Sequence, residues 1–336
     1  MGKLAFVFPG QGSQSVGMGH DLANGFAEAR ETFEKIDQIA AVSSGRTGKN
    51  VLSTLCFEGP EEELKRTVNT QPTIMAVSLA AYAALTSSAK GGGKMPRPDF
   101  VAGHSLGEIT ALCVASVLSM EDAVKLVEKR ASLMESCPKG AMAAVLKMKA
   151  EALEALCAEV QEALKAEGAQ GTDSCVLIAN YNTPEQLVIS GNPNAITRAC
   201  ALVKERGGKA IPLPVGGAFH SPLMSGAAAE FSQVLQSVAF ADAKIEVVQN
   251  YDAQASKQAD VLKGKLAKQM ESAVRWTATV EYMSAAGVDT IVEIGPGKVL
   301  TGLVKKINEN IRVYNVFDGE SLKAAAEAIS SLSTVP

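Results

Sequence analysis

A serine between two glycines is the feature of this sequence best suited to chemistry. It lies in the stretch 103–108, which reads GHSLGE, after the apolar run Phe100–Ala102 and before a helix-compatible run from Glu108 to Leu118. Gly-x-Ser-x-Gly between a strand and a helix is typical of a nucleophile elbow, a sharp turn that holds the serine at its tip. The start of the helix offers N–H groups and a partial positive charge to an oxyanion formed on the serine's acyl adduct. The pattern predicts Ser105 as a nucleophile, and the alternative is an ordinary Gly/Ser turn.

A serine nucleophile needs a base, and the chain has three histidines. His104 directly precedes Ser105, so on an extended backbone its side chain points to the opposite face. His20 follows the first loop, and nothing in the sequence positions it. His220 lies in the segment 216–222 (GGAFHSP), a loop between two predicted subdomains, where clefts tend to form. We therefore predict His220 as the base, with a structural or surface histidine as the alternative.

The group that orients the imidazole stays open at this point. A triad usually supplies an Asp or Glu, but a carbonyl can also accept the Nδ1–H. No histidine follows position 220, whereas α/β-hydrolases place first the acid and then a late histidine after the serine. Because further strands are expected after His220, the chain is a poor fit to that order.

Composition narrows the function classes. The chain has 336 residues, of which 47% are hydrophobic and 20% charged, with a formal net charge of -4 and no long basic run, so nucleic acid is not an expected partner. Six cysteines show no C-x-x-C spacing and are expected to be buried, reduced thiols. No apolar run has the length of a membrane span. We therefore expect a cytoplasmic protein without a membrane partner, or a plastid or mitochondrial matrix protein if a transit peptide has been removed.

The two outer parts of the chain alternate strand and helix patterns, which is typical of a parallel α/β sheet. Residues 3–8 (KLAFVF) form an expected buried strand, and the loop 9–14 (PGQGSQ) that follows has glycines and amides that allow close approach to a ligand. Pro72 is expected to open a long apolar helix. Lys90–Lys94, which reads KGGGK, is expected to be a flexible connection before the elbow strand.

The middle of the chain has a different pattern. Within about 75 residues the expected order is β-α-β-β-α-β, the ferredoxin-like arrangement. We predict an inserted ferredoxin-like subdomain over residues 140–215. The fold class is thus α/β, with a hydrolase-like core of mostly parallel sheet that is discontinuous in sequence, over 1–139 and 216–336.

Together these motifs resemble the malonyl-CoA:acyl carrier protein transacylases, acyltransferases that load malonyl groups for fatty acid synthesis. The resemblance runs through most of the chain in family order and implies the same two-part fold. It is carried by FPGQGSQ (8–14), GHSLGE (103–108), Arg130 within the helix 127–134, GAMA (140–143), NYN (180–182), AFHS (218–221) and EIGPGKVL (293–300).

The resemblance implies a catalytic set. Ser105 would attack the malonyl thioester with help from His220. The backbone carbonyl of Gln269 would orient the imidazole, which would account for the missing acid. The oxyanion would be held by the N–H of Leu106 and by the loop at Gln11.

The resemblance also implies a substrate pocket. Arg130 would pair with the free malonyl carboxylate through a planar fork that suits it better than lysine. From the sequence alone, Arg130 reads as a solvated helix charge. Asn180 and Phe219 would bind substrate, and Phe219 resembles the form of its motif associated with malonyl rather than a branched group. Gly216 departs from the serine often found there, which makes the loop more flexible and removes a possible hydrogen bond.

The implied reaction is a ping-pong transfer from malonyl-CoA to the phosphopantetheine thiol of acyl carrier protein, with no metal or other cofactor. Family members usually act as monomers. Two competing classes are a serine hydrolase or thioesterase, in which water deacylates the enzyme, and a catalytically inactive binding module.

Overall fold

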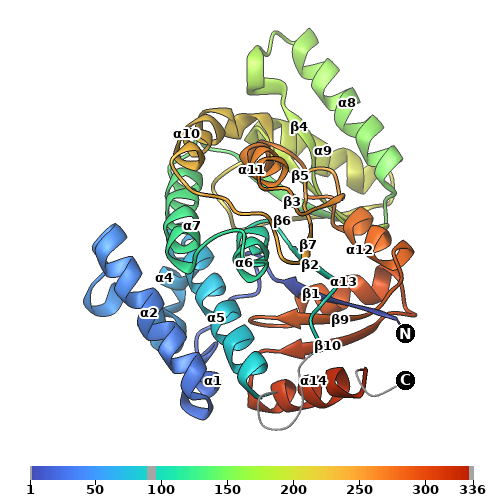
Figure 1. Ribbon diagram of the computed structural model, residues 1–336. Coiled ribbons are helices and arrows are strands. Elements are labelled where there is room, and N and C mark those ends of the chain that lie inside the picture. The colour runs from blue at the N-terminus through green and yellow to red at the C-terminus, as the bar shows by residue number, and fades with distance from the viewer. Residues whose placement is uncertain (1, 89–95, 333–336) are drawn as a thin grey trace.

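A six-stranded sheet lies at the centre of the computed structural model, which describes residues 2–88 and 96–332 (Figure 1). The strand order across the sheet is β10 (Arg312–Val316), β9 (Val288–Ile294), β1 (Lys3–Phe8), β2 (Phe100–Gly103), β7 (Glu246–Val248) and β8 (Ala255–Ser256). Every neighbouring pair is parallel except β7 with β8. The expected mostly parallel α/β core is confirmed.

Strand β1 shows why this sheet is covered on both faces. Leu4, Phe6 and Phe8 pack into the larger apolar core, whereas Ala5 and Val7 point the other way into a second core. Side chains alternate between the two faces of a strand, so a strand buried on both faces reads as a continuous apolar run.

Helices cover the two faces from different parts of the chain. One face packs against α12 (Trp276–Ala285) and α13 (Val299–Ile307). The opposite core includes residues of α5 (Thr67–Ser88), α6 (Gly107–Val114), α7 (Met120–Glu135) and α14 (Gly319–Leu332). Further helices are α1 (His20–Gly25), α2 (Ala27–Ser44), α3 (Leu52–Glu58), α4 (Glu61–Lys65), α10 (Ser225–Gln236) and α11 (Ala259–Lys268).

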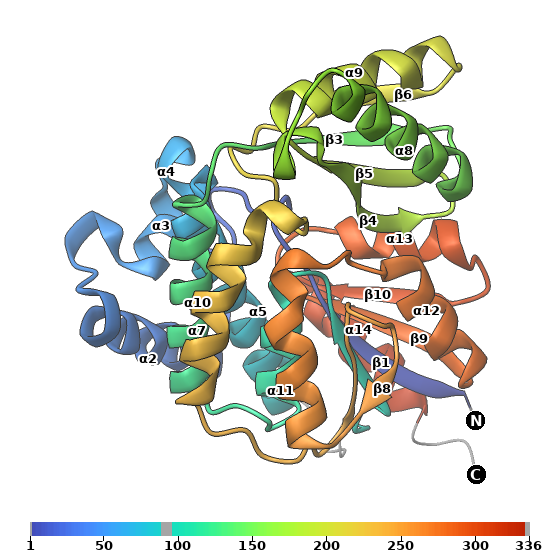
Figure 2. The same ribbon diagram turned by 90° about the horizontal axis from the view of Figure 1, so that it is seen from above.

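A separate antiparallel sheet is formed by the middle of the chain. Its strand order is β4 (Val176–Thr183), β5 (Gln186–Gly191), β3 (Ala141–Leu146) and β6 (Lys209–Pro212). Helices α8 (Ala150–Ala166) and α9 (Pro193–Glu205) lie on one face of it with their own apolar core (Figure 2). The element order is the predicted β-α-β-β-α-β. The Gly140 N–H donates to the Gly216 carbonyl where the chain enters and leaves this region, and we propose 140–215 as the bounds of the subdomain.

One helix starts earlier than expected, and one expected connection is not described by the structure. The helix expected to start at Pro72 begins at Thr67, so Pro72 lies inside α5 and that prediction was wrong. Proline removes one helical hydrogen bond, and the structure replaces that bond with a side chain described below. The expected flexible connection Lys90–Lys94 lies outside the described residues.

All six cysteines are free thiols, buried or half-buried. Burial raises the pKa of Cys113 and of Cys157 to about 12. Among residues 2–88 and 96–332, no helix is long and apolar enough to cross a membrane.

Candidate active site

Ser105 lies at the tip of a sharp turn between β2 and α6. Its φ is 54°, a left-handed conformation that is rare for a residue with a side chain. A Cβ on Gly103 would lie 1.9 Å from the carbonyl carbon of Gly107, and a Cβ on Gly107 would lie 2.2 Å from the carbonyl oxygen of Phe8. Both glycines are therefore required by backbone that crosses at close range.

An asparagine from the loop after the neighbouring strand β7 holds the backbone of this turn. The Ser105 N–H donates to Asn250 Oδ1 at 2.7 Å, and Asn250 Nδ2 donates to the Gly103 carbonyl at 2.7 Å. The Asn250 N–H donates in turn to the fully buried Glu108, at 2.6 Å. Burial raises the pKa of the Glu108 carboxyl. The turn is thus tied on both sides of Ser105 to the loop after β7.

His220 faces Ser105. Its Nε2 lies 2.8 Å from Ser105 Oγ, while Nδ1 lies 3.0 Å from the Gln269 carbonyl and 3.1 Å from the Ser272 carbonyl. Carbonyls only accept, so Nδ1 carries the proton and Nε2 is free to accept from the serine hydroxyl. Burial and the nearby Arg130 charge lower the pKa of His220 to about 3, so the ring is neutral.

Arg130 reaches the same serine oxygen from α7. Its side chain is fully buried, and Nη2 donates to Ser105 Oγ at 3.0 Å and to Gln269 Oε1 at 2.9 Å. Nη1 donates to Gln71 Oε1 at 2.7 Å. Burial lowers the pKa of Arg130 to about 10, which keeps it charged near neutral pH. Among the described residues no carboxylate is hydrogen-bonded to Arg130, and a cation so placed beside the Ser105 hydroxyl suits an acyl group that carries a negative charge.

The other two histidines lie away from the serine hydroxyl. His104 Nε2 lies 2.8 Å from Asn182 Oδ1, and its ring packs on Trp276 with centroids 5.7 Å apart. Burial lowers the pKa of His104 as well. His20 is exposed and contacts Asn24 and Phe57. Of the three histidines, only His220 is hydrogen-bonded to Ser105.

The remaining predicted residues are not all brought to Ser105. Leu106 directly follows Ser105 as the residue before α6, and among the hydrogen bonds of the described residues none uses its N–H. Gln11 follows Gly10, on which a Cβ would lie 2.5 Å from the His104 carbonyl oxygen. The described part of the chain shows no hydrogen bond from Gln11 to Ser105. Asn180 is buried in β4 and pairs with Val274 rather than with the serine.

The loop that carries His220 is packed at one glycine and open at another. Phe219 is buried in the larger core, and a Cβ on Gly217 would lie 2.5 Å from its ring. A Cβ on Gly216 would meet nothing within 4 Å. A serine at position 216 would thus fit without displacing a neighbour.

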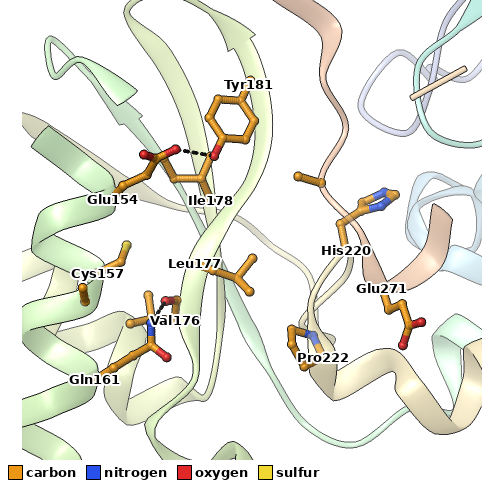
Figure 3. Close-up of a pocket in the computed structure, with 12 residues that line it drawn as sticks. Glu154, Cys157, Gln161, Val176, Leu177, Ile178, Tyr181, His220, Pro222 and Glu271 are labelled. Atoms are coloured by element: carbon orange, nitrogen blue, oxygen red, sulfur yellow. Dashed lines mark hydrogen bonds between the residues drawn. The ribbon is translucent and has the colours of Figure 1, made fainter. Parts of the chain in front are cut away.

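A pocket of about 280 Å³ lies on the other side of His220, between β4 and the segment that contains Glu271 (Figure 3). Leu177 points toward this space and the Tyr181 hydroxyl donates to Glu154, whereas the His220 ring is directed away from it. The pocket therefore borders the back of the histidine loop and not the serine oxygen. In the described ranges no group of three or more His, Cys, Asp or Glu side chains could hold a metal ion.

Four site contacts were missed from the sequence. They come from Gln71, Asn182, Asn250 and the carbonyl of Ser272. Three are amide side chains in segments far from Ser105 in sequence, and the fourth is a backbone group. The sequence signal for such contacts is a polar residue next to an apolar run, as in VVQN at 247–250. This pattern is too common to identify these four residues.

Known proteins resemble this chain over almost its whole length. Residues 5–321 match the family described as acyl transferase domain. The malonyl CoA-acyl carrier protein transacylase of Bacillus subtilis is 42% identical over 333 residues, covering 98% of both chains, and that of Escherichia coli K12 is 39% identical over 97% of this chain and all of the relative.

Solved structures agree. An acyl carrier protein S-malonyltransferase from Vibrio cholerae superposes with a TM-score of 0.86 at 39% identity, over 96% of this chain and 99% of its own. A malonyl-transacylase in complex with a type II polyketide acyl carrier protein superposes with a TM-score of 0.86 at 37% identity, over 97% of this chain and 99% of its own. The chain therefore belongs to the acyl transferase domain family, and within it to the malonyl-CoA:acyl carrier protein transacylases.

Proposed function

We propose that this protein transfers the malonyl group of malonyl-CoA to the phosphopantetheine thiol of acyl carrier protein, through a malonyl ester on Ser105, for fatty acid synthesis. One observation carries the proposal: Ser105 Oγ lies 2.8 Å from His220 Nε2 and 3.0 Å from Arg130 Nη2. A base and a buried cation thus meet at one hydroxyl. The names of the relatives support the same substrates.

In the first half-reaction, His220 Nε2 takes the Ser105 proton as the oxygen attacks the thioester carbonyl. The CoA sulfur then leaves, and the imidazolium returns the proton to it. The carbonyls of Gln269 and Ser272 hold the Nδ1–H and so keep the ring in the tautomer that can accept the serine proton.

The tetrahedral intermediate places a negative charge near the start of α6. We assign the Leu106 N–H and a donor from the Gln11 loop to this oxyanion, since the helix N-terminus and free N–H groups stabilise such charge. Gly10 brings the loop against the elbow, which allows backbone at Gln11 to come close.

Arg130 sets the acyl preference. The malonyl carboxylate would replace the Ser105 and Gln269 oxygens as the partner of its guanidinium. Burying a carboxylate is costly unless a cation pairs with it, and a planar fork does so with two parallel bonds. We assign Asn180 and Phe219 to the surrounding pocket wall.

In the second half-reaction, the phosphopantetheine thiol attacks the malonyl ester while His220 accepts its proton and passes it to Ser105. Each step is a proton transfer or an acyl transfer, so the reaction as written uses no metal or redox cofactor. All its residues come from one chain, and a monomer is expected to be active. Six free cysteines suit a reducing compartment such as the cytoplasm.

The test is intact-mass spectrometry of the enzyme after mixing with malonyl-CoA, followed by addition of holo acyl carrier protein. We expect one malonyl adduct on the wild type, none on Ser105→Ala, and movement of the group to the carrier protein. An adduct that disappears in water as fast as with the carrier protein would point to a thioesterase. No adduct at all would point to a binding module.

A further inference from the structure

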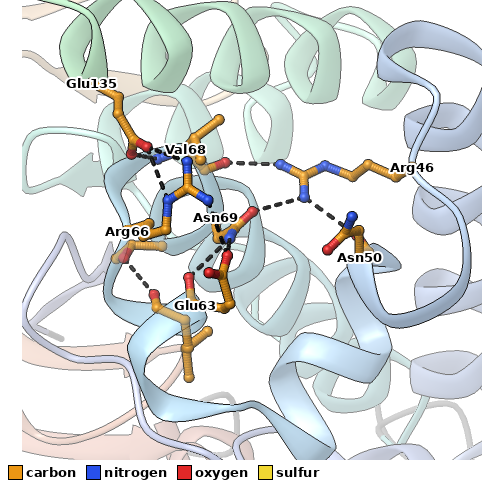
Figure 4. Close-up of polar contacts among 9 residues, drawn as sticks. Arg46, Asn50, Glu63, Arg66, Val68, Asn69 and Glu135 are labelled. Atoms are coloured by element: carbon orange, nitrogen blue, oxygen red, sulfur yellow. Dashed lines mark hydrogen bonds and ion pairs between the residues drawn. The ribbon is translucent and has the colours of Figure 1, made fainter.

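A second arginine, with a largely buried side chain, joins the two helices that carry Gln71 and Arg130. Arg46 follows the end of α2, and its side chain is 10% exposed. Its Nη2 donates to the Val68 carbonyl at 2.8 Å and its Nη1 to Asn69 Oδ1 at 2.9 Å, both in the first turn of α5 (Figure 4). Its Nε donates to Glu128 of α7 at 2.7 Å.

Pro72 explains why the Val68 carbonyl needs this partner. In an α-helix that carbonyl accepts from the N–H four residues later, and proline has none. Pro72 lies inside α5, so the structure leaves the Val68 carbonyl without its helical partner. The Arg46 guanidinium supplies the missing donor from outside the helix.

At the other end of this link, Glu128 is held firmly. It is buried, with a side chain 8% exposed. Besides Arg46, the hydroxyls of Ser43 and Ser44 donate to its two oxygens, each at 2.7 Å. Three donors satisfy the carboxylate, so the end of α2 and the middle of α7 form one polar unit.

The same two helix segments meet again inside the active site. Gln71 lies two residues after Asn69, and Arg130 lies two residues after Glu128. Gln71 Oε1 accepts from Arg130 Nη1 at 2.7 Å, and Gln71 Nε2 donates to Met134 Sδ at 3.1 Å. One turn of α5 is thus linked to α7 at two places. Arg46 makes the link near the surface, through Glu128, and Gln71 makes it beside Ser105, through Arg130. A shift of that turn would move Gln71 away from the guanidinium.

We propose that Arg46 is a positioning residue for malonyl selectivity: by bonding the carbonyl that Pro72 leaves free and tying it to Glu128, it fixes Gln71 against Arg130. This inference rests on the proposed function, in which Arg130 binds the malonyl carboxylate. Acetyl transfer does not use that pairing, so Arg46 acts on the malonyl-to-acetyl ratio more than on the chemistry.

The test compares kcat/KM for malonyl-CoA and acetyl-CoA in wild type and Arg46→Met. We expect a loss of about tenfold for malonyl-CoA, mainly in KM, and less than about twofold for acetyl-CoA. Arg46→Lys keeps the charge beside Glu128 but not the fork, so it should lose about threefold for malonyl-CoA. Should Arg46→Met fail to give a native circular dichroism spectrum, Arg46→Lys decides by the same ratio. Equal losses for both substrates, or none, would overturn the proposal.

Arg66→Met is the matched control. Arg66 also links the start of α5 to α7, through Glu135 at 2.8 Å, but its side chain is 53% exposed and it does not touch the Val68 carbonyl. Water replaces such contacts at little cost, so the ratio should stay within about twofold of wild type. An equal loss of ratio in this control would contradict a role specific to Arg46.

A double-mutant cycle with Gln71→Ala tests whether Arg46 acts on Arg130 through Gln71. If Arg46 acts through Gln71, Arg46→Met should change the malonyl-to-acetyl ratio by less than about twofold in the Gln71→Ala background. The same tenfold loss there would overturn the inference. A wild type that forms no malonyl adduct would instead refute the proposed function, so the two failures are told apart.

Discussion

The two glycine-containing turns that carry Ser105 and His220 differ in how tightly they are packed. At the elbow, a Cβ on Gly103 or Gly107 would lie 1.9 or 2.2 Å from backbone atoms. At the histidine loop, a Cβ on Gly216 would meet nothing within 4 Å, and one on Gly217 would meet side-chain atoms of Phe219 and Cys137 rather than backbone. Yet Ser105 and His220 both have positive φ, 54° and 58°. Ser105 is thus fixed by backbone crossing backbone, whereas His220 is fixed by hydrogen bonds to its ring and by burial.

Substitutions in the two turns should therefore have different effects. Changes at the elbow should act through the backbone and affect fold and chemistry together. Changes at His220 should act through the imidazole, and the entrance of the loop at Gly216 should tolerate a side chain.

The largest effect is expected from His220→Ala. Loss of a general base costs about 10²–10⁴-fold in rate, while the elbow stays intact. His104→Ala should slow acylation far less and lower thermal stability, because that ring packs on Trp276. Quenched-flow measurements of the acylation rate with malonyl-CoA, together with thermal melts, compare the two variants. The reverse ranking of the two rates would move the base to His104.

The next largest effect is expected from Gly107→Ala. The added methyl would meet the Phe8 carbonyl, and relief of such overlap costs about 3 kcal/mol or more in the free energy of unfolding. Displacement of Ser105 by about 1 Å would also slow acylation by about a hundredfold. Urea unfolding and acylation rates check this. Wild-type values for both would show that the elbow is less tightly packed than the distances indicate.

The pH profile of kcat/KM distinguishes a His220 with a lowered pKa from a histidine of ordinary pKa. The pKa of His220 is lowered to about 3, chiefly by burial, so the neutral, active form persists as pH falls to 5. A histidine of ordinary pKa would lose about tenfold in kcat/KM by pH 5.5, and we expect less than about twofold. A malonyl carboxylate on Arg130 would offset that charge and raise the pKa in the bound complex. A break in kcat/KM near pH 6.5 would contradict a buried, neutral His220.

Much of this arrangement could be predicted from the sequence, because its signals are local. The elbow combines spacing and context within a few residues, and the antiparallel sheet follows from apolar runs in β-α-β-β-α-β order. Arg130 could be placed only by resemblance, since its burial depends on Gln71 and Gln269 from distant segments. Asn250 and Ser272 lie after other elements, and nothing local distinguishes them. Thr67 as the start of α5 was missed because the donor that makes Pro72 tolerable comes from Arg46.

The smallest effect is expected from Gly216→Ser. The site is open and no positive φ demands glycine there, so stability should change by less than about 0.5 kcal/mol and malonyl transfer by less than about twofold. Thermal melts and kcat/KM for malonyl-CoA test it. A tenfold change in transfer would show that the loop entrance forms part of the malonyl pocket.

We propose that Arg130 makes Ser105 specific for a malonyl group. Measurement of kcat/KM for malonyl-CoA and acetyl-CoA in wild type and Arg130→Ala, with holo acyl carrier protein as acceptor, tests this role. Removing the cation would leave a buried carboxylate unpaired, at a cost of about 3–5 kcal/mol, or roughly a hundredfold to a few thousandfold in malonyl transfer. Acetyl transfer should be unchanged or faster, and Arg130→Lys should recover only part of the malonyl rate. If Arg130→Ala slowed both substrates equally, Arg130 would be a structural residue and the account of malonyl specificity would be wrong.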